Sequence, residues 1–463
     1  MPNSRLPVLL ALILALLTAP ACAPTPTALP PAIEATRAPT DPAAPTAPPA
    51  TDSADPTPTP IPIAPIIIES YELFEDDSGE LVVIGRLVNT STSNLTGIQL
   101  AFDFYDVNNT LIFTEPAWYP HLFNLPPGAA TPFSYTVFNA ANVATVQPSV
   151  VAYQPADLTP VELSLTGQQL RRDDFGDAHC TGQLTNPTDQ PVRLSEIAAE
   201  ILTATDAVIG AASGYNHLSL LRPGESTPFR ITVNALKPGE TARTCRVYVD
   251  SIAATDAAFT DVTTLTAEPL ARYTDALGGQ HVLGQLTNPT DQPYTVLLIV
   301  GLYDTSGNVL DSLAYPLPLP VLPPGLVTPL DVDFTSLISY TTDLPDQIAE
   351  ARFLLDPLFT RPLPGVETVT LTLTADLFDP TTTSWAYAGR ARNDSGRSLD
   401  QIAAQVVVRN PFGEVVAVAA SREVLTLLPG DETTFNLFLW KPANANPVDS
   451  TYEITVYGYD EPN

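Results

Sequence analysis

The chain has 463 residues, of which 44% are hydrophobic, and this excludes a wholly disordered protein and favours about three to four domains. Its 51 acidic residues against 20 basic ones give a net charge of −31, so the surface repels phosphate backbones and we expect no nucleic-acid partner. Such a surface could hold a diffuse cloud of divalent cations, but a solvated acidic surface is the simpler interpretation.

Residues 1–21 are typical of an export signal. Arg5 precedes an apolar run, Leu6 to Leu17, that is short of the roughly 20 residues a membrane span needs, and small residues then lead to Cys22. The residues 19–21, Ala-Pro-Ala, satisfy the A-x-A pattern of ordinary signal peptidase. The segment also resembles a bacterial lipobox, in which the cysteine becomes the lipidated first residue, although the usual Leu is replaced by Ala19.

Residues 22–65 are predicted to be a disordered tether. From Ala23 to Pro65 the sequence is almost entirely Pro, Thr and Ala, with no apolar periodicity from which a core could form. Such a segment is an extended, semi-rigid spacer. A spacer directly after Cys22 suits domains held off a membrane, so we expect lipid attachment at Cys22 and anchoring outside the cytoplasm. Free secretion is the alternative.

The remainder of the chain is a tandem repeat. The run GQLTNPTDQP occupies 182–191 and again 284–293, and fainter copies begin with GRLVN and GRARN. Each copy has a glycine and, four positions later, an asparagine: Gly85 and Asn89, Gly182 and Asn186, Gly284 and Asn288, Gly389 and Asn393. A second landmark, L-x-P-G, ends 43, 42, 41 and 41 residues after the four glycines, at 128, 224, 325 and 430. This spacing predicts modules over 66–157, 158–267, 268–372 and 373–463, each the size of an immunoglobulin-like sandwich.

Within each module the apolar residues recur with a period of two. In IQLAFDFYD, Ile98, Leu100, Phe102 and Phe104 share one face, and in QIAAQVVV the same is true of Ile402, Ala404, Val406 and Val408. This is the pattern of half-buried antiparallel strands, and turn signals such as NPTDQ and RPGE separate the runs. The predicted fold class is therefore all-β, with four tandem immunoglobulin-like antiparallel β-sandwich modules.

The duplicated run has a structural interpretation. Gly182 and Gly284 would let a neighbouring strand or ring pack close to the backbone, and the asparagine would start a turn by bonding the backbone two residues on. The asparagine is common to all copies, whereas the proline after it is replaced by Thr90 and Asp394 in the first and last. Duplication of a turn explains the identity of the middle copies, and a shared ligand-binding loop is the alternative.

Two cysteines remain after Cys22. Cys180 and Cys245 fall in one module, and in an oxidising exterior such a pair is most simply a disulfide. The alternative, a metal pair, lacks two further ligands at suitable spacing.

The GxLxN turn, then FDFYD (102–106) or VGLYD (300–304), then LxPG, resembles the FxLYD-type and related immunoglobulin-like modules of prokaryotic envelope proteins. The resemblance covers roughly 66–463. Copies two and four depart from it, because the Tyr-Asp pair is absent from them. The resemblance implies an extracytoplasmic β-sandwich and carries no catalytic residues.

The sequence offers no constellation that predicts catalysis, so we expect neither an enzyme nor a cofactor. His179 and His281, and likewise His121 and His217, recur at equivalent positions, which suits strand histidines at the surface or half-buried. The acidic runs 72–80 and 171–177 lack the calcium-loop spacing and are predicted to be hairpin turns, with calcium between modules as the alternative.

The expected function is that of a scaffold or adhesive surface, whose partners would be envelope proteins. Carbohydrate or wall-polymer binding is the alternative. Its candidate residues are aromatic side chains that could form a sugar platform or simply pack: Trp118, Tyr119, Trp385, Trp440 and Tyr459.

Overall fold

The computed structural model describes residues 65–137, 141–254, 264–334, 341, 343–380, 384–443 and 450–460. Every described residue belongs to one compact unit, Ile63–Asn463. The predicted export signal, Cys22 and the predicted tether up to Ala64 lie outside the described residues.

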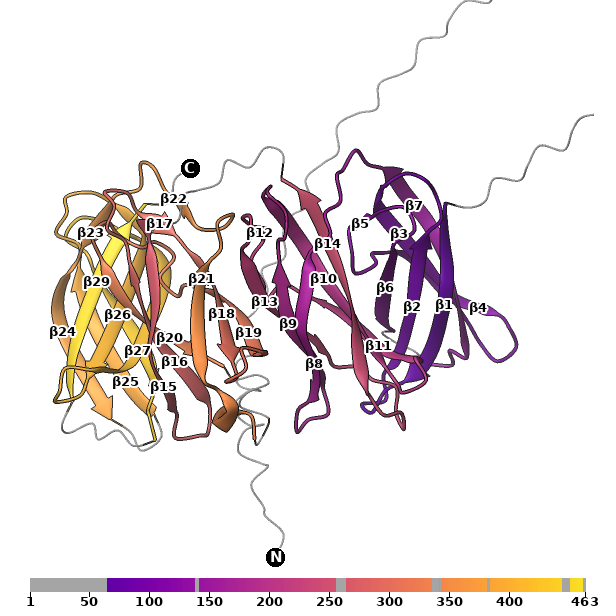
Figure 1. Ribbon diagram of the computed structural model, residues 1–463. Helices are drawn as coiled ribbons and strands as arrows, with labels where there is room; N and C mark the ends of the chain where they lie inside the picture. The colour runs from indigo at the N-terminus through magenta and orange to yellow at the C-terminus, as the bar shows by residue number, and fades with distance from the viewer. Residues whose placement is uncertain are drawn as a thin grey trace, which may run out of the picture. The chain divides into compact units, whose positions relative to one another are not determined.

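The first two repeats have the same order of strands (Figure 1). Repeat 1 comprises β1 (Ile66–Glu75), β2 (Leu81–Asn89), β3 (Leu95–Tyr105), β4 (Leu111–Trp118), β5 (Asn124–Leu125), β6 (Ala130–Val137) and β7 (Thr145–Pro155). Repeat 2 comprises β8 (Ser164–Arg172), β9 (Ala178–Thr185), β10 (Val192–Leu202), β11 (Val208–Gly214), β12 (Leu220–Leu221), β13 (Ser226–Val233) and β14 (Thr244–Ala253).

The third and fourth repeats vary this order. Repeat 3 comprises β15 (Thr266–Thr274), β16 (Gln280–Thr287), β17 (Tyr294–Thr295), β18 (Leu297–Tyr303), β19 (Val309–Pro316), β20 (Val327–Asp333), the short 3-10 helix η3 (Pro345–Gln347), β21 (Glu350–Leu355) and β22 (Arg361–Pro362). Repeat 4 comprises β23 (Thr368–Thr370), β24 (Thr372–Pro380), β25 (Ser384–Arg392), β26 (Leu399–Arg409), β27 (Val415–Leu427), β28 (Glu432–Trp440) and β29 (Thr451–Tyr459).

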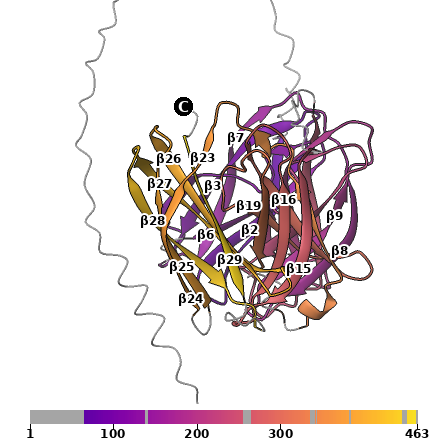
Figure 2. The same cartoon turned by 90° about the vertical axis from the view of Figure 1, so that its left-hand side faces the viewer.

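Each repeat folds into two main antiparallel sheets (Figures 1 and 2), and repeat 3 also has the two-stranded sheet β17-β22. The sheet that carries the repeat glycine, here called the glycine sheet, has the order β1-β2-β6, β13-β9-β8, β15-β16-β20 and β24-β25-β28 in the four repeats. The opposing sheet is centred on β3, β10, β18 or β26, flanked on one side by β4, β11, β19 or β27 and on the other by β7, β14, β21 or β29. One apolar core lies between the two sheets of each repeat. The predicted all-β sandwich fold is confirmed.

A phenylalanine ring covers the glycine of every repeat. A Cβ atom built on Gly85, Gly182 or Gly389 would lie 2.2, 2.8 or 2.3 Å from the ring of the residue paired with it across the sheet, respectively Phe133, Phe229 and Phe435. In repeat 3 the ring over Gly284 belongs instead to Phe353 of β21, in the opposing sheet, at 2.0 Å. The predicted close approach of a ring is therefore confirmed, although it is reached from either sheet.

The repeat asparagines are fully buried and hold two turns together. The Oδ1 atom of Asn186 accepts hydrogen bonds from the backbone N and hydroxyl of Thr188, at 3.0 and 2.7 Å. Its Nδ2 donates to the carbonyls of Gln190 and Leu221, and its backbone N donates to the carbonyl of Glu225. Asn89, Asn288 and Asn393 make the equivalent bonds. The turn predicted at this residue is confirmed. The asparagine side chain also donates a hydrogen bond to the backbone carbonyl of the leucine in L-x-P-G.

Consecutive repeats pack sheet against sheet. Contacts join β11 to β2 and β6, β19 to β9 and β13, and β27 to β16 and β20. The glycine sheet of each of the first three repeats therefore covers the outer face of the opposing sheet of the next. Outward-facing residues of β26 such as Ala403, Gln405 and Val407 are consequently buried, as are those of β10. The prediction of half-buried strands is correct for β3 of repeat 1 and wrong for β10, β18 and β26.

We predict that Asn186→Ala lowers the free energy of unfolding by about 3 kcal/mol, because two buried carbonyls lose their donor and Thr188 loses its acceptor. The matched control is Pro187→Thr, which copies Thr90 of repeat 1 and should change stability by less than about 1 kcal/mol. Urea unfolding followed by circular dichroism measures both. Equal effects of the two variants would contradict a structural role for the carboxamide.

Candidate functional site

The cysteines of repeat 2 form a disulfide. Cys180 of β9 and Cys245 of β14 are bonded, with their Cα atoms 6.1 Å apart. The bond joins the glycine sheet of repeat 2 to its opposing sheet, inside the core. The predicted pairing is confirmed, and neither sulfur is a thiolate that a metal could bind.

The acidic runs form hairpin turns. In run 72–80, Asp76 Oδ1 accepts hydrogen bonds from the backbone N of Ser78 and of Glu80, both at 2.9 Å. In run 171–177, Asp173 Oδ1 binds the backbone N of Phe175 and Asp177 in the same way, at 3.0 Å. The predicted turns are confirmed. Across the described ranges, no group of three or more His, Cys, Asp or Glu side chains could hold a metal ion.

The histidines lie deeper than their sequence context predicts. His121 is half-buried, but His179, His217 and His281 are buried. His179 and His281 are in the outer faces of glycine sheets, which the next repeat covers. The prediction of surface or half-buried positions is therefore wrong for these three. For His179 and His281 the reason is that it assumed that the outer faces of the sandwiches are solvated.

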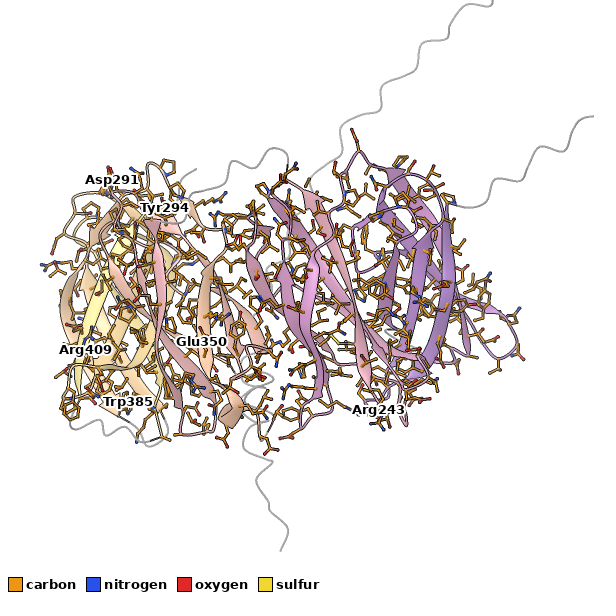
Figure 3. All side chains as sticks on the ribbon, in the orientation of Figure 1. Arg243, Asp291, Tyr294, Glu350, Trp385 and Arg409 are labelled. Atoms are coloured by element: carbon orange, nitrogen blue, oxygen red, sulfur yellow. A yellow bond between two sulfur atoms is a disulfide. The ribbon has the colours of Figure 1, made fainter. Side chains whose placement is uncertain are left out.

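The five candidate aromatic residues do not gather on one face. Trp385 and Tyr459 are buried in repeat 4 (Trp385 is labelled in Figure 3). Trp118 and Tyr119 are exposed in repeat 1, where Trp118 Nε1 donates to the carbonyl of Ser134 at 2.9 Å. Trp440 is half-buried beside repeat 3. The five residues thus do not form one platform, and Trp440 is considered further because it lines a cavity.

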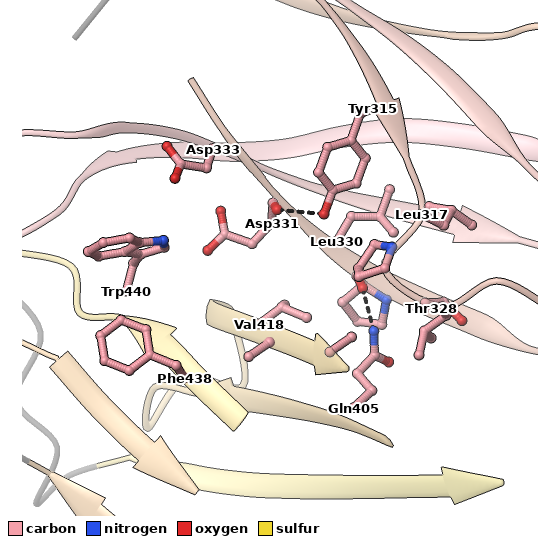
Figure 4. A pocket seen from close by; sticks show the side chains of 15 residues that line it. Tyr315, Leu317, Thr328, Leu330, Asp331, Asp333, Gln405, Val418, Phe438 and Trp440 are labelled. Atoms are coloured by element: carbon pink, nitrogen blue, oxygen red, sulfur yellow. Dashed lines mark hydrogen bonds between the residues drawn. The ribbon is translucent and has the colours of Figure 1, made fainter. Parts of the chain in front are cut away.

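Trp440 borders a cavity of about 210 Å³ where repeats 3 and 4 meet (Figure 4). One side is aromatic, formed by the edge-to-face rings of Phe438 and Trp440, whose centroids are 5.4 Å apart. The other side is polar, formed by Asp331 and Asp333 of β20 and the ring of Tyr315 of β19. The remaining lining residues include Leu317, Thr328, Leu330, Gln405 and Val418.

Hydrogen bonds hold the polar side in place. Tyr315 Oη donates to the carbonyl of Asp331 at 2.9 Å, and Gln405 Nε2 donates to the carbonyl of Pro329 at 2.9 Å, linking the repeats (Figure 4). The carboxylate of Asp331 accepts further bonds from Tyr273 and from His281 Nδ1, the latter at 2.9 Å. The ring of Tyr273 stacks on His281 with centroids 4.6 Å apart.

These contacts shift two ionisation equilibria. Burial opposes a charge on His281, but its bond to Asp331 and the nearby carboxylates outweigh burial, so the pKa of this imidazole is raised. Burial and the adjacent carboxylate of Asp331 both raise the pKa of Tyr273. The cavity therefore combines an aromatic edge with hydrogen-bond acceptors and negative charge, a combination that can hold a small polar or cationic ligand.

The sequence singled out Trp440 but not Asp331, Tyr315 or Gln405. The alternation of their strands marks Asp331 and Gln405 only as outward-facing and Tyr315 only as a core residue of repeat 3. No spacing or motif brings them together, because the cavity exists only where two repeats meet.

Comparisons with known proteins add little. No protein-family model matches the chain, and no curated protein sequence matches it. Among solved structures, the chain is similar to a cryo-EM reconstruction of the native conformation of E. coli alpha-2-macroglobulin, with 8% identity and a TM-score of 0.12. The match covers 83% of this chain and 28% of that one. In the part of the chain that the structure describes, no helix is long and apolar enough to cross a membrane.

We predict that His281 stabilises the fold more at low pH than at high pH. Because its pKa is raised on folding, its contribution is complete below its ordinary pKa of about 6.5 and is lost as the pH rises through the raised value. The urea midpoint of the wild type should therefore fall towards that of His281→Gln as the pH increases. A difference between the two proteins that stays constant with pH would exclude a raised pKa.

Proposed function

We propose that the protein is a non-catalytic scaffold of the cell envelope, anchored by lipid on Cys22, whose immunoglobulin-like repeats serve as an interaction surface. The export signal and the Pro/Thr-rich tether support the location. The observation that best supports a scaffold role is the contact between consecutive repeats. Domains joined only by linkers move freely, whereas an extensive interface restrains them.

The contact between repeats 2 and 3 illustrates this restraint. Arg230 Nη1 lies 2.6 Å from Asp311 Oδ1, and both side chains are buried. Ser219 N donates to Asp356 Oδ2 at 2.6 Å, and Ile299 of repeat 3 packs with the core of repeat 2. Separating the repeats would break these bonds and expose to water the apolar surface of Ile299, which repeat 2 covers. A scaffold needs such resistance to bending.

Cross-linking in intact cells tests the anchored scaffold. We expect the wild type to remain with the membrane and to capture one envelope protein near stoichiometrically. Cys22→Ala should lose both the lipid and the capture, while its repeats still unfold cooperatively. Recovery of unlipidated wild type in the medium would contradict anchoring. Capture of nothing reproducible by the lipidated wild type would contradict a dedicated interaction surface.

The cavity beside Trp440 favours a second candidate function, binding of carbohydrate or wall polymer. Sugars pack their apolar faces on aromatic rings and place hydroxyls against carboxylate and amide groups, and Phe438, Trp440, Asp331 and Gln405 supply these partners.

If this second function holds, Trp440→Ala should weaken retention on purified wall polymer by about fivefold, since one stacking face is lost. Trp118→Ala is the matched control, because that ring is exposed in a different repeat, and it should have no effect. Affinity electrophoresis in gels containing the polymer compares the two. Equal retardation of wild type and Trp440→Ala would remove the cavity from consideration as a sugar site.

A further inference from the structure

The internal contacts between repeats follow one rule that leaves two faces without an internal partner. In each contact, the glycine sheet of one repeat meets the opposing sheet of the next. Among the described residues, no repeat covers the outer face of the opposing sheet of repeat 1 or the outer face of the glycine sheet of repeat 4. One of these faces is an opposing sheet and the other is a glycine sheet. Together they are the two surfaces that meet in each of the three contacts between consecutive repeats.

The outer face of the opposing sheet is here called the receiving half of the contact. The first residue of its flanking strand, β4, β11, β19 or β27, marks this half. Val208, Val309 and Val415 begin β11, β19 and β27, and they pair with Leu202, Tyr303 and Arg409. Each lies against the preceding repeat: Val208 packs on Phe74, Val82 and Ile84, Val309 is buried and its carbonyl accepts the hydroxyl of Thr181, and Val415 packs with Leu283.

Leu111 occupies this position in repeat 1. It begins β4 and pairs with Tyr105, in the same register as the three valines. Its side chain is 51% exposed, although its equivalents are covered. An apolar residue kept at a position that serves an interface elsewhere in the chain indicates an interface here as well.

The other half, which inserts into the next repeat, is marked by the outward residues three positions and one position before the repeat glycine. Val82 and Ile84 in repeat 1, and His281 and Leu283 in repeat 3, are buried there by the next repeat. The equivalent residues of repeat 4 are Ala386, which is half-buried, and Ala388, which is exposed. Ala388 pairs with Leu377 of β24, whose side chain is 67% exposed.

The two free faces carry opposite charges at the positions that form an ion pair in the contact between repeats 1 and 2. Arg86 follows the glycine of repeat 1, and its Nε lies 3.9 Å from Glu200 of β10. Arg390 follows the glycine of repeat 4; its side chain is 54% exposed, and its Nη1 lies 3.6 Å from the carboxylate of Glu432 on the same sheet. Asp103 occupies in β3 the place that Glu200 occupies in β10, since each pairs with the third residue after Leu111 or Val208. Stacking a second copy in register would bring Arg390 near Asp103.

We infer that the chain associates head to tail with a second copy of itself. The outer face of β3 and β4 in one copy receives the outer face of β24 and β25 in the next, and the contact reproduces the one between internal repeats. The two patches differ, so the interface is heterologous and each added copy presents a new free face. The inference concerns the repeats alone and does not depend on the lipid anchor or on the proposed scaffold function.

Sedimentation velocity of the purified full chain tests this inference. The wild type should form dimers and longer species in a concentration series up to about 100 μM. Leu111→Asp and Leu377→Asp should each associate at least about tenfold more weakly, because each places a carboxylate in the contact. Both residues are exposed, so the variants should keep the wild-type melting transition and the disulfide.

Mixing the variants identifies the geometry. An equimolar mixture of Leu111→Asp and Leu377→Asp should form dimers but nothing longer, because each variant retains one intact face. Asp103→Arg and Arg390→Asp should each weaken association, and the two changes combined in one chain should restore it.

A wild type that remains monomeric throughout the series would overturn the inference. Association that neither apolar variant weakens would also overturn it, because the contact would lie elsewhere. Failure of the mixture to dimerise would overturn it as well, since it would reveal a symmetric contact between identical faces.

Discussion

A buried carboxamide at one end of each repeat is the interaction on which the rest of the fold depends. A neutral amide can donate two hydrogen bonds and accept two, and in this protein it bonds its own turn and the strand leading to L-x-P-G. The chain between the two landmarks begins and ends at these hydrogen bonds, so large changes in its length would strain them. The spacing of 41 to 43 residues is therefore nearly constant, whereas the distance between successive glycines varies from 97 to 105.

The contacts between repeats decide which surfaces a partner can reach. Glu200 has no exposed side-chain surface, and its carboxylate accepts bonds from Arg246 at 3.1 Å and Tyr248 at 2.7 Å. Such partners offset the large cost of removing a charge from water. The outer faces of the internal sheets are consequently covered. Within the described residues, a binding function can rest on the turns, on cavities where repeats meet, such as the one beside Trp440, and on the outer faces of the first and last repeats.

The cavity illustrates how function can arise between modules that are individually unremarkable sandwiches. Asp331 and Tyr315 come from repeat 3, whereas Phe438, Trp440 and Gln405 come from repeat 4. Its geometry thus depends on the bond between Gln405 and the carbonyl of Pro329, which fixes one repeat on the other. A ligand held there would in turn strengthen the contact between the repeats, because it would bind only their assembled form.

The sequence by itself determined the all-β fold, the repeat, the turn at each asparagine, the close packing over each glycine and the Cys180–Cys245 pair. These features are local or are written twice along the chain, so periodicity and spacing reveal them. Only the tertiary structure decided that β10, β18 and β26 are buried on both faces and that His179, His217 and His281 are covered. Only the tertiary structure shows that Trp440 and Asp331 line the same cavity. The physical reason is that polar residues on a covered sheet face are hydrogen-bonded to each other. In the sequence they cannot be distinguished from polar residues that are exposed to solvent.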